Sequence, residues 1–133
     1  SLLVLSGKAG AVTMDLAELN LTSGEARLFK WGAAPSWVLK KKGAEKIGTA
    51  GPPPGMSVTD ARETVERLSL RRGETLILLS DGVDGEGVLR HMKESSLLPP
   101  GELAARLLEL GASEGTDDAT AAVVRITAAA LST

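Results

Sequence analysis

Short apolar stretches that alternate with polar residues recur along most of the chain, and this period of two is typical of β-strands. Turn-forming segments such as Thr22-Ser23-Gly24 and Lys41-Lys42-Gly43 separate neighbouring stretches. The predicted strands are residues 14–21, 25–31, 37–40, 44–47, 63–70, 75–80 and 119–126. The pattern therefore predicts antiparallel sheet made of hairpins, with one meander between residues 13 and 47.

Two further segments predict a loop between sheet regions and a buried strand. Residues 49–55 contain three consecutive prolines, which lack backbone N–H donors, so we expect a loop that crosses between sheet regions. Residues 75–80 form a continuous apolar run with no polar face, which predicts a strand covered on both sides. We expect this strand to be central.

Two helices are predicted between the last two strands. The first covers residues 86–95, and the second covers residues 101–110, between Pro99-Pro100 and Gly111. Leucines recur on one face of the second helix, at positions 103, 107 and 110. Together with the strands, these helices predict an α+β fold.

Composition narrows the class of protein. The chain has 133 residues, 43% of them hydrophobic, which is enough for one domain with its own core, over residues 1–133. Fifteen basic and seventeen acidic residues give a net charge of −2, which disfavours nucleic acid as a partner. No cysteine is present, so thiolate chemistry is excluded, and no apolar run approaches the ~20 residues of a membrane span. We expect a cytoplasmic protein without membrane contact.

Two acidic motifs are the strongest candidates for chemistry. Ser80-Asp81-Gly82 ends the central apolar strand, and Asp117-Asp118-Ala119-Thr120 begins the last strand. If the two strands pair antiparallel, the end of the first lies beside the start of the second. Two carboxylates at such a point suit a hard divalent cation.

Simpler explanations exist for several residues. Asp81-Gly82 alone is good turn chemistry, and a calcium loop that starts at Asp81 fails because Val83 occupies its third position and Met92 its twelfth. Asp84 and Glu86 suit the first turn of the following helix, where acidic residues act as caps.

The remaining unusual residues favour structural roles. His91 falls inside a predicted helix, which gives little support for a general acid. The run 40–42 of three lysines is expected to be a solvated turn, and Arg71-Arg72 another charged turn. Trp31 and Trp37 are expected to pack in the core.

The ordered set of motifs resembles the C-terminal half of metal-dependent protein phosphatases of the protein phosphatase 2C class, in particular the bacterial sporulation stage II protein E branch. Besides the two acidic motifs, four further segments match in order, which spreads the resemblance over nearly the whole chain. They are Met14-Asp15-Leu16-Ala17, residues 30–36 (Lys-Trp-Gly-Ala-Ala-Pro-Ser), Pro54-Gly55-Met56 and residues 72–76 (Arg-Gly-Glu-Thr-Leu).

This resemblance implies an antiparallel β-sandwich flanked by helices, with two Mn²⁺ or Mg²⁺ ions between the sheets. It implies a serine/threonine protein phosphatase in which a metal-bound hydroxide attacks the phosphorus, so that no catalytic residue is needed beyond the metal ligands. Asp81 and Asp117 take the places of metal ligands, with Gly82 beside the metal and Asp118 helping to position the site. The implied partner is a phosphorylated regulatory protein, such as an anti-sigma-factor antagonist.

The sequence lacks one motif of the family pattern. Family members carry an upstream Asp-Gly motif that bridges both metals, and this sequence has no counterpart before Ser1; Asp15 matches an ordinary strand position instead. We therefore expect an incomplete sandwich that lacks its N-terminal strands, the C-terminal portion of a phosphatase domain. Activity is then expected of the parent protein, and the isolated portion can be inactive. The alternative is an inactive phosphatase-like module used for protein association. An exposed sheet edge or face in such a portion predicts a homo-oligomer or exchange of elements between copies.

Overall fold

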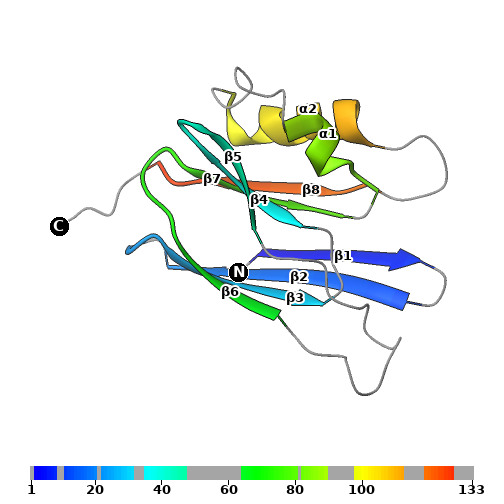
Figure 1. Ribbon diagram of the computed structural model, residues 1–133, viewed down its shortest axis with the longest axis horizontal. Helices are drawn as coiled ribbons and strands as arrows, with labels where there is room; N and C mark the ends of the chain where they lie inside the picture. Colours follow the sequence, from blue (N-terminus) through cyan, green and yellow to red (C-terminus); the bar gives the residue numbers. More distant parts are fainter. Residues whose placement is uncertain are drawn as a thin grey trace.

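A computed structural model shows two antiparallel sheets and two helices arranged in three layers (Figure 1). The structure describes residues 2–8, 11–20, 22–31, 35–47, 64–80, 82–89, 98–112 and 119–127. Sheet A has the strand order β1-β2-β3-β6, formed by β1 (Leu2–Lys8), β2 (Ala11–Leu19), β3 (Glu25–Trp31) and β6 (Thr64–Ser69). Sheet B has the order β5-β4-β7-β8, formed by β5 (Gly43–Ile47), β4 (Ser36–Lys40), β7 (Thr75–Leu79) and β8 (Ala121–Arg125).

The helices α1 (Gly85–Leu89) and α2 (Pro100–Gly111) cover the face of sheet B that points away from sheet A (Figure 1). Sheet B is therefore the middle layer, and its strand β7 has a neighbour on each side. All five residues of β7 are buried, which confirms the prediction of a central strand without a polar face.

Side chains of β7 alternate between two hydrophobic cores, because successive residues of a strand point to opposite faces. Leu76 and Leu78 join the core between the two sheets, which also contains Leu28 of β3. Ile77 and Leu79 join the core between sheet B and the helices. The two cores hold the three layers together through this one strand.

The β2–β3 hairpin depends on a glycine in the left-handed region. Gly24 has φ 78°, and a Cβ at this position would lie 2.3 Å from the carbonyl oxygen of Leu70. The Gly24 carbonyl in turn accepts a hydrogen bond of 2.8 Å from the Leu70 N–H. Only glycine fits both the turn and this close approach, so the turn also fixes the end of β6 against β3.

The predicted meander over residues 13–47 is wrong in one respect, because its strands divide between the sheets. β2 and β3 lie in sheet A, whereas β4 and β5 lie in sheet B. The chain passes from β5 in sheet B to β6 in sheet A, and residues 49–55, which were predicted to cross between sheet regions, lie outside the described residues. The pattern missed β1, so that Asp15 lies in the second strand, because the short apolar run at residues 2–5 suits a buried helix as well as a buried strand.

Helix α2 agrees with its prediction except at Leu110. Leu103 and Leu107 are fully buried, but Leu110 is 56% exposed. In the last turn the helix approaches Val83 and Val88 through Gly111, whose absent Cβ would lie 2.9 Å from Val88 Cγ2. At its C-terminal end the helix therefore packs through Gly111 and not through Leu110. Helical periodicity alone predicted that Leu110 would be buried. Of the helix predicted at 86–95, residues 86–89 are described and helical, and the helix begins one residue earlier, at Gly85.

No helix in the described part of the chain is long and apolar enough to cross a membrane.

Candidate functional site

The end of β7 and the start of β8 lie side by side, as the hypothesis for the two acidic motifs requires. The strands pair antiparallel with Leu79 opposite Ala121. Beyond this pair, the Ser80 N–H donates to the Thr120 carbonyl at 3.0 Å, and the Thr120 N–H donates to Ser80 Oγ at 2.8 Å. Two hydrogen bonds therefore tie the residue before Asp81 to a residue just after Asp118.

The predicted carboxylates themselves, Asp81, Asp117 and Asp118, lie outside the described residues. Gly82 is described and is buried in a tight turn, which the Val83 N–H closes by donating to the Ser80 carbonyl at 3.1 Å. Elsewhere in the described ranges, no three His, Cys, Asp or Glu side chains come together as a metal site would require. Carboxylate oxygens are the ligands that Mn²⁺ and Mg²⁺ prefer, so the residue types of the two motifs fit such ions.

Of the two acidic residues predicted to cap the following helix, Asp84 does so, whereas Glu86 lies in the first turn and pairs with a lysine. Asp84 Oδ1 accepts a hydrogen bond of 2.9 Å from the Gly87 N–H, as an N-cap residue does. Glu86 pairs with Lys46 of β5, which joins the first turn of α1 to the edge of sheet B. Both side chains therefore help to fix α1 beside the candidate site.

A buried ionic cluster lies between the sheets at the same end of the molecule. Lys30 Nζ lies 2.6 Å from Asp15 Oδ1 and 2.9 Å from Ser36 Oγ, and all three residues are at most 1% exposed. Asp15 and Lys30 are opposite each other on β2 and β3, whereas Ser36 begins β4 of the other sheet. The cluster therefore links sheet A to sheet B.

The strand register places this cluster near the candidate site. Trp37, the residue after Ser36, lies opposite Ile77 on β7, so Ser36 and the end of β7 occupy the same end of sheet B. The sequence singled out the segments around Asp15 and Lys30 only as family-like motifs. Their association was not predicted, because alternation along a strand does not reveal a charged pair that points inward.

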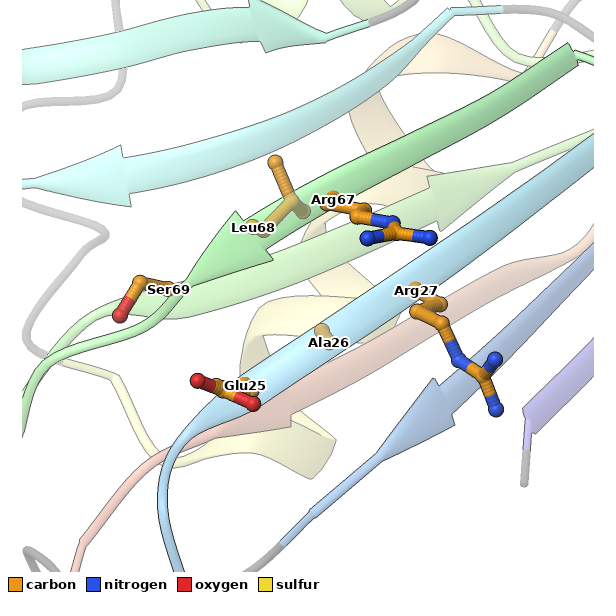
Figure 2. A pocket seen from close by; sticks show the side chains of 6 residues that line it. All are labelled: Glu25, Ala26, Arg27, Arg67, Leu68 and Ser69. Atoms are coloured by element: carbon orange, nitrogen blue, oxygen red, sulfur yellow. The ribbon is translucent and has the colours of Figure 1, made fainter.

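A shallow depression of about 450 Å³ lies on sheet A, at the opposite end of β3 and β6 (Figure 2). Its walls include the cross-strand pairs Glu25–Ser69 and Arg27–Arg67. The Arg27 guanidinium forms an ion pair with Glu18 and lies 5.8 Å from the centre of the Phe29 ring, so it is held towards β2. The polar groups do not converge here, which makes this depression a poor candidate for the functional site.

Other sequence predictions concern single side chains. Residues 40–42 are exposed at the β4–β5 turn, and Arg71 and Arg72 are exposed at the turn before β7, as predicted. Trp37 is 6% exposed and packs in the core beneath the helices, which confirms its predicted role. His91 lies outside the described residues, and for Trp31 only the backbone is described.

Known structures share this fold. A Bacillus subtilis structure of the PP2C phosphatase domain with a fragment of the regulatory domain of SpoIIE is 28% identical, with a TM-score of 0.70 over 92% of this chain and 41% of that one. The manganese-presoaked phosphatase domain of SpoIIE from Bacillus subtilis is 25% identical, with a TM-score of 0.62 over 88% of this chain and 57% of that one.

A more distant match is the serine/threonine phosphatase PstP/Ppp of Mycobacterium tuberculosis, at 18% identity and a TM-score of 0.67, over 89% of this chain and 61% of that one. The chain thus spans less than two thirds of the length of each of these structures. No curated protein sequence matches significantly.

A family model extends the agreement to the sequence itself. The model for Stage II sporulation protein E (SpoIIE) matches residues 3–127. The antiparallel sandwich with helices on one face agrees with the fold of the phosphatase domains above. The chain belongs to the SpoIIE family.

Proposed function

We propose that this chain is part of a protein serine/threonine phosphatase that depends on Mn²⁺ or Mg²⁺ and acts on a phosphorylated regulatory protein. Membership of the SpoIIE family supports phosphatase activity in general. The observation that carries the proposal to particular residues is the pair of hydrogen bonds between Ser80 and Thr120, which joins the ends of the strands that bear the acidic motifs. Residues 1–133 would then be one domain, the C-terminal portion of a phosphatase domain.

The proposed site uses carboxylate oxygens from two strand ends. Asp81 and Asp117 would hold a divalent ion, with two ions in the complete site, and Asp118 would orient a neighbouring group. When bound, the ions supply Lewis acidity and lower the pKa of a water molecule, which removes the need for a protein nucleophile. Manganese is also the ion used to soak the SpoIIE phosphatase domain from Bacillus subtilis.

Described residues hold the backbone beside both acidic motifs. The double hydrogen bond between Ser80 and Thr120 fixes the spacing of the two motifs, because both backbone segments are held at the same sheet end. Gly82 is buried and carries no side chain, so the turn stays compact next to Asp81. These features hold the backbone next to both acidic motifs, and a backbone held in place before an ion binds favours tight binding.

Charge-removing substitutions test the proposal. In the full-length parent protein, we expect Asp81→Asn and Asp117→Asn each to abolish calorimetrically measured Mn²⁺ binding and hydrolysis of a phosphoserine peptide. Asp118→Asn should weaken Mn²⁺ binding by only about 10- to 100-fold, as a residue behind the ligands does. Glu109→Gln, on the exposed side of α2, is the matched control and should change neither Mn²⁺ binding nor phosphopeptide hydrolysis.

Unchanged Mn²⁺ affinity in both Asp81→Asn and Asp117→Asn would refute the assignment of these ligands. A protein that binds no divalent ion and hydrolyses no phosphopeptide would instead be a module for protein association.

A further inference from the structure

The space between the two sheets changes from apolar to polar at the end that bears the acidic motifs. On four strands, an inward-facing polar residue stands two positions from an apolar residue of the core, and residues two apart on a strand share a face. These pairs are Ala17 and Asp15 on β2, Leu28 and Lys30 on β3, Val38 and Ser36 on β4, and Leu78 and Ser80 at the end of β7. All four polar residues are at most 3% exposed, so they form a buried polar layer.

Stability alone does not account for this polar layer. The Asp15–Lys30 ion pair is fully buried, and replacing such a pair by apolar residues of similar volume is often neutral or stabilising. Apolar residues already fill the neighbouring inward positions on the same strands. Buried groups that break the pattern of a core without a gain in stability are expected near functional sites.

Lys30 connects the polar layer across the two sheets. Its Nζ lies 2.6 Å from Asp15 Oδ1 in sheet A and 2.9 Å from Ser36 Oγ at the first residue of β4 in sheet B. Because β3 and β4 are consecutive strands in different sheets, the contact between Lys30 and Ser36 closes the crossing between them. The start of β4 is therefore held from the opposite sheet.

The start of β4 lies beside the end of β7. Extending the observed β4–β7 register by one residue brings Ser36 level with Leu78, two residues before Ser80. On the other side of β7, Ser80 exchanges hydrogen bonds with Thr120. The end of β7 thus has β4 on one side and the start of β8 on the other, and Asp81 follows directly.

We propose that Lys30 is a positioning residue for the candidate metal site: through Ser36 it holds the end of β7, and with it the backbone next to Asp81. The inference rests on the proposed phosphatase function for the identity of the ion and its ligands. An ammonium group has no lone pair to offer a metal, so Lys30 acts only through its neighbours.

Deletion of one buried hydroxyl tests this coupling while the ion pair stays in place. Ser36→Ala removes the sheet B partner of Lys30 and leaves the contact of Lys30 with Asp15. Thr75→Val is the matched control, because it removes another buried hydroxyl at the opposite end of β7, where Thr75 Oγ1 accepts a hydrogen bond of 2.9 Å from Arg125 Nε.

Amide hydrogen exchange measured by NMR reads the two ends of the β7–β8 pairing separately. The Ser80 and Thr120 amides form hydrogen bonds at the site end, and the Ile126 amide donates to a backbone carbonyl at 3.0 Å at the other end. Ser36→Ala should speed exchange at Ser80 and Thr120 by about tenfold, the effect of one lost hydrogen bond, and leave Ile126 unchanged. Thr75→Val should leave Ser80 and Thr120 unchanged. Unaltered exchange at Ser80 and Thr120 in Ser36→Ala, or an equal increase at all three amides, overturns the positioning role.

Ion binding in the full-length parent protein connects this coupling to the site. Ser36→Ala should weaken calorimetrically measured Mn²⁺ binding by about 10- to 100-fold, whereas Thr75→Val should not change it. Asp15→Leu/Lys30→Met, which replaces the ion pair by apolar side chains, should weaken Mn²⁺ binding by a similar factor even though the protein stays folded. Mn²⁺ affinity that is normal in this double variant would assign the pair to stability alone and overturn the proposal.

Two outcomes separate this inference from the proposed function. If Ser36→Ala speeds exchange only at Ser80 and Thr120, but the unsubstituted parent binds no Mn²⁺, the coupling of Lys30 to the end of β7 is supported and the metal-dependent phosphatase function fails. If the parent binds Mn²⁺ and hydrolyses a phosphoserine peptide, yet Ser36→Ala binds Mn²⁺ with unchanged affinity, the positioning role is overturned and the phosphatase function stands.

Discussion

Lys30 is the most unusual residue of the interior, because a lysine seldom lies fully buried without a partner. Here its ammonium group contacts the Asp15 carboxylate and the Ser36 hydroxyl, and no part of either charged side chain reaches solvent. The ion pair offsets the large desolvation penalty of both charges. Its position suggests that it fixes how the two sheets sit at the end of the fold that bears the acidic motifs.

Removing one charge of this pair should be strongly destabilising. We expect Lys30→Met to lower the free energy of unfolding by about 3–5 kcal/mol, because it leaves the Asp15 carboxylate buried without its counter-ion. Urea denaturation followed by circular dichroism measures the change. The double variant Asp15→Leu/Lys30→Met should recover most of the loss, and equal destabilisation of the single and double variants would rule out this coupling.

An exposed lysine gives a prediction at alkaline pH. A hydrogen bond to Glu45 and the negative charge of this carboxylate raise the pKa of Lys40 above its ordinary value of 10.5. Because the folded pKa is the higher one, the pair contributes its small stabilisation below pH 10.5 and loses it as the pH rises through the folded pKa. Glu45→Gln should lower the pKa of Lys40, which NMR titration of its side chain measures, whereas Glu66→Gln in sheet A should not. An unchanged Lys40 titration in Glu45→Gln would contradict the assigned cause.

At the scale of elements, α1 is held by close packing more than by its length. Its described part has only five residues, but Asp84 caps its first turn, and an isolated bridge joins Val83 to Ala112 after α2. The Asp84 N–H also donates to the Gly111 carbonyl at 2.9 Å. The helices and the turn at residues 80–82 therefore form one connected unit at the end of β7.

Adding a methyl group at the start of α1 should disturb this unit. Gly85→Ala should lower the free energy of unfolding by about 1–3 kcal/mol, because the new Cβ overlaps the Trp37 indole and Leu79. Gly101→Ala is the matched control, since a Cβ there meets nothing within 4 Å and helical alanine is favoured over glycine by about 0.5–1 kcal/mol. Thermal unfolding distinguishes the two, and a neutral Gly85→Ala would contradict the close packing.

At the scale of the whole molecule, the three layers leave one sheet face without a helix from α1 or α2. On the outer face of sheet A, Leu16, Phe29 and Val65 lie opposite one another on β2, β3 and β6. Leu16 and Phe29 are half-buried, and Val65 is 44% exposed. An apolar row of this kind is typical of a surface that another element or another copy covers.

Self-association of the 133-residue chain therefore stays a prediction that can be measured directly. We expect light scattering to show a mass above that of the monomer at high protein concentration, and Val65→Lys to shift the equilibrium towards the monomer by about tenfold, since a buried charge opposes association. Leu110→Lys, on the exposed side of α2, is the control for a general effect of added charge. A chain that remains monomeric throughout would contradict the prediction.

The sequence by itself determined most of the strands, the central position of β7 and the family. These features depend on short-range signals: alternation, a continuous apolar run, turn glycines, and motifs that keep their order along the chain. The same local signals predicted the Asp84 cap and the solvated turn at residues 40–42, which the structure confirms. The metal ligands Asp81 and Asp117 remain a prediction from the sequence.

Only the tertiary structure decided how the strands divide between two sheets and which distant groups meet. The Lys30 cluster, the pairing of Ser80 with Thr120 and the close packing of Gly85 against Trp37 each join residues from elements far apart in the chain. The local pattern carries no such information, because it reports which side of a strand is buried but not what lies across from it. The exposure of Leu110 has the same cause, since the direction of packing at a helix end depends on its neighbours.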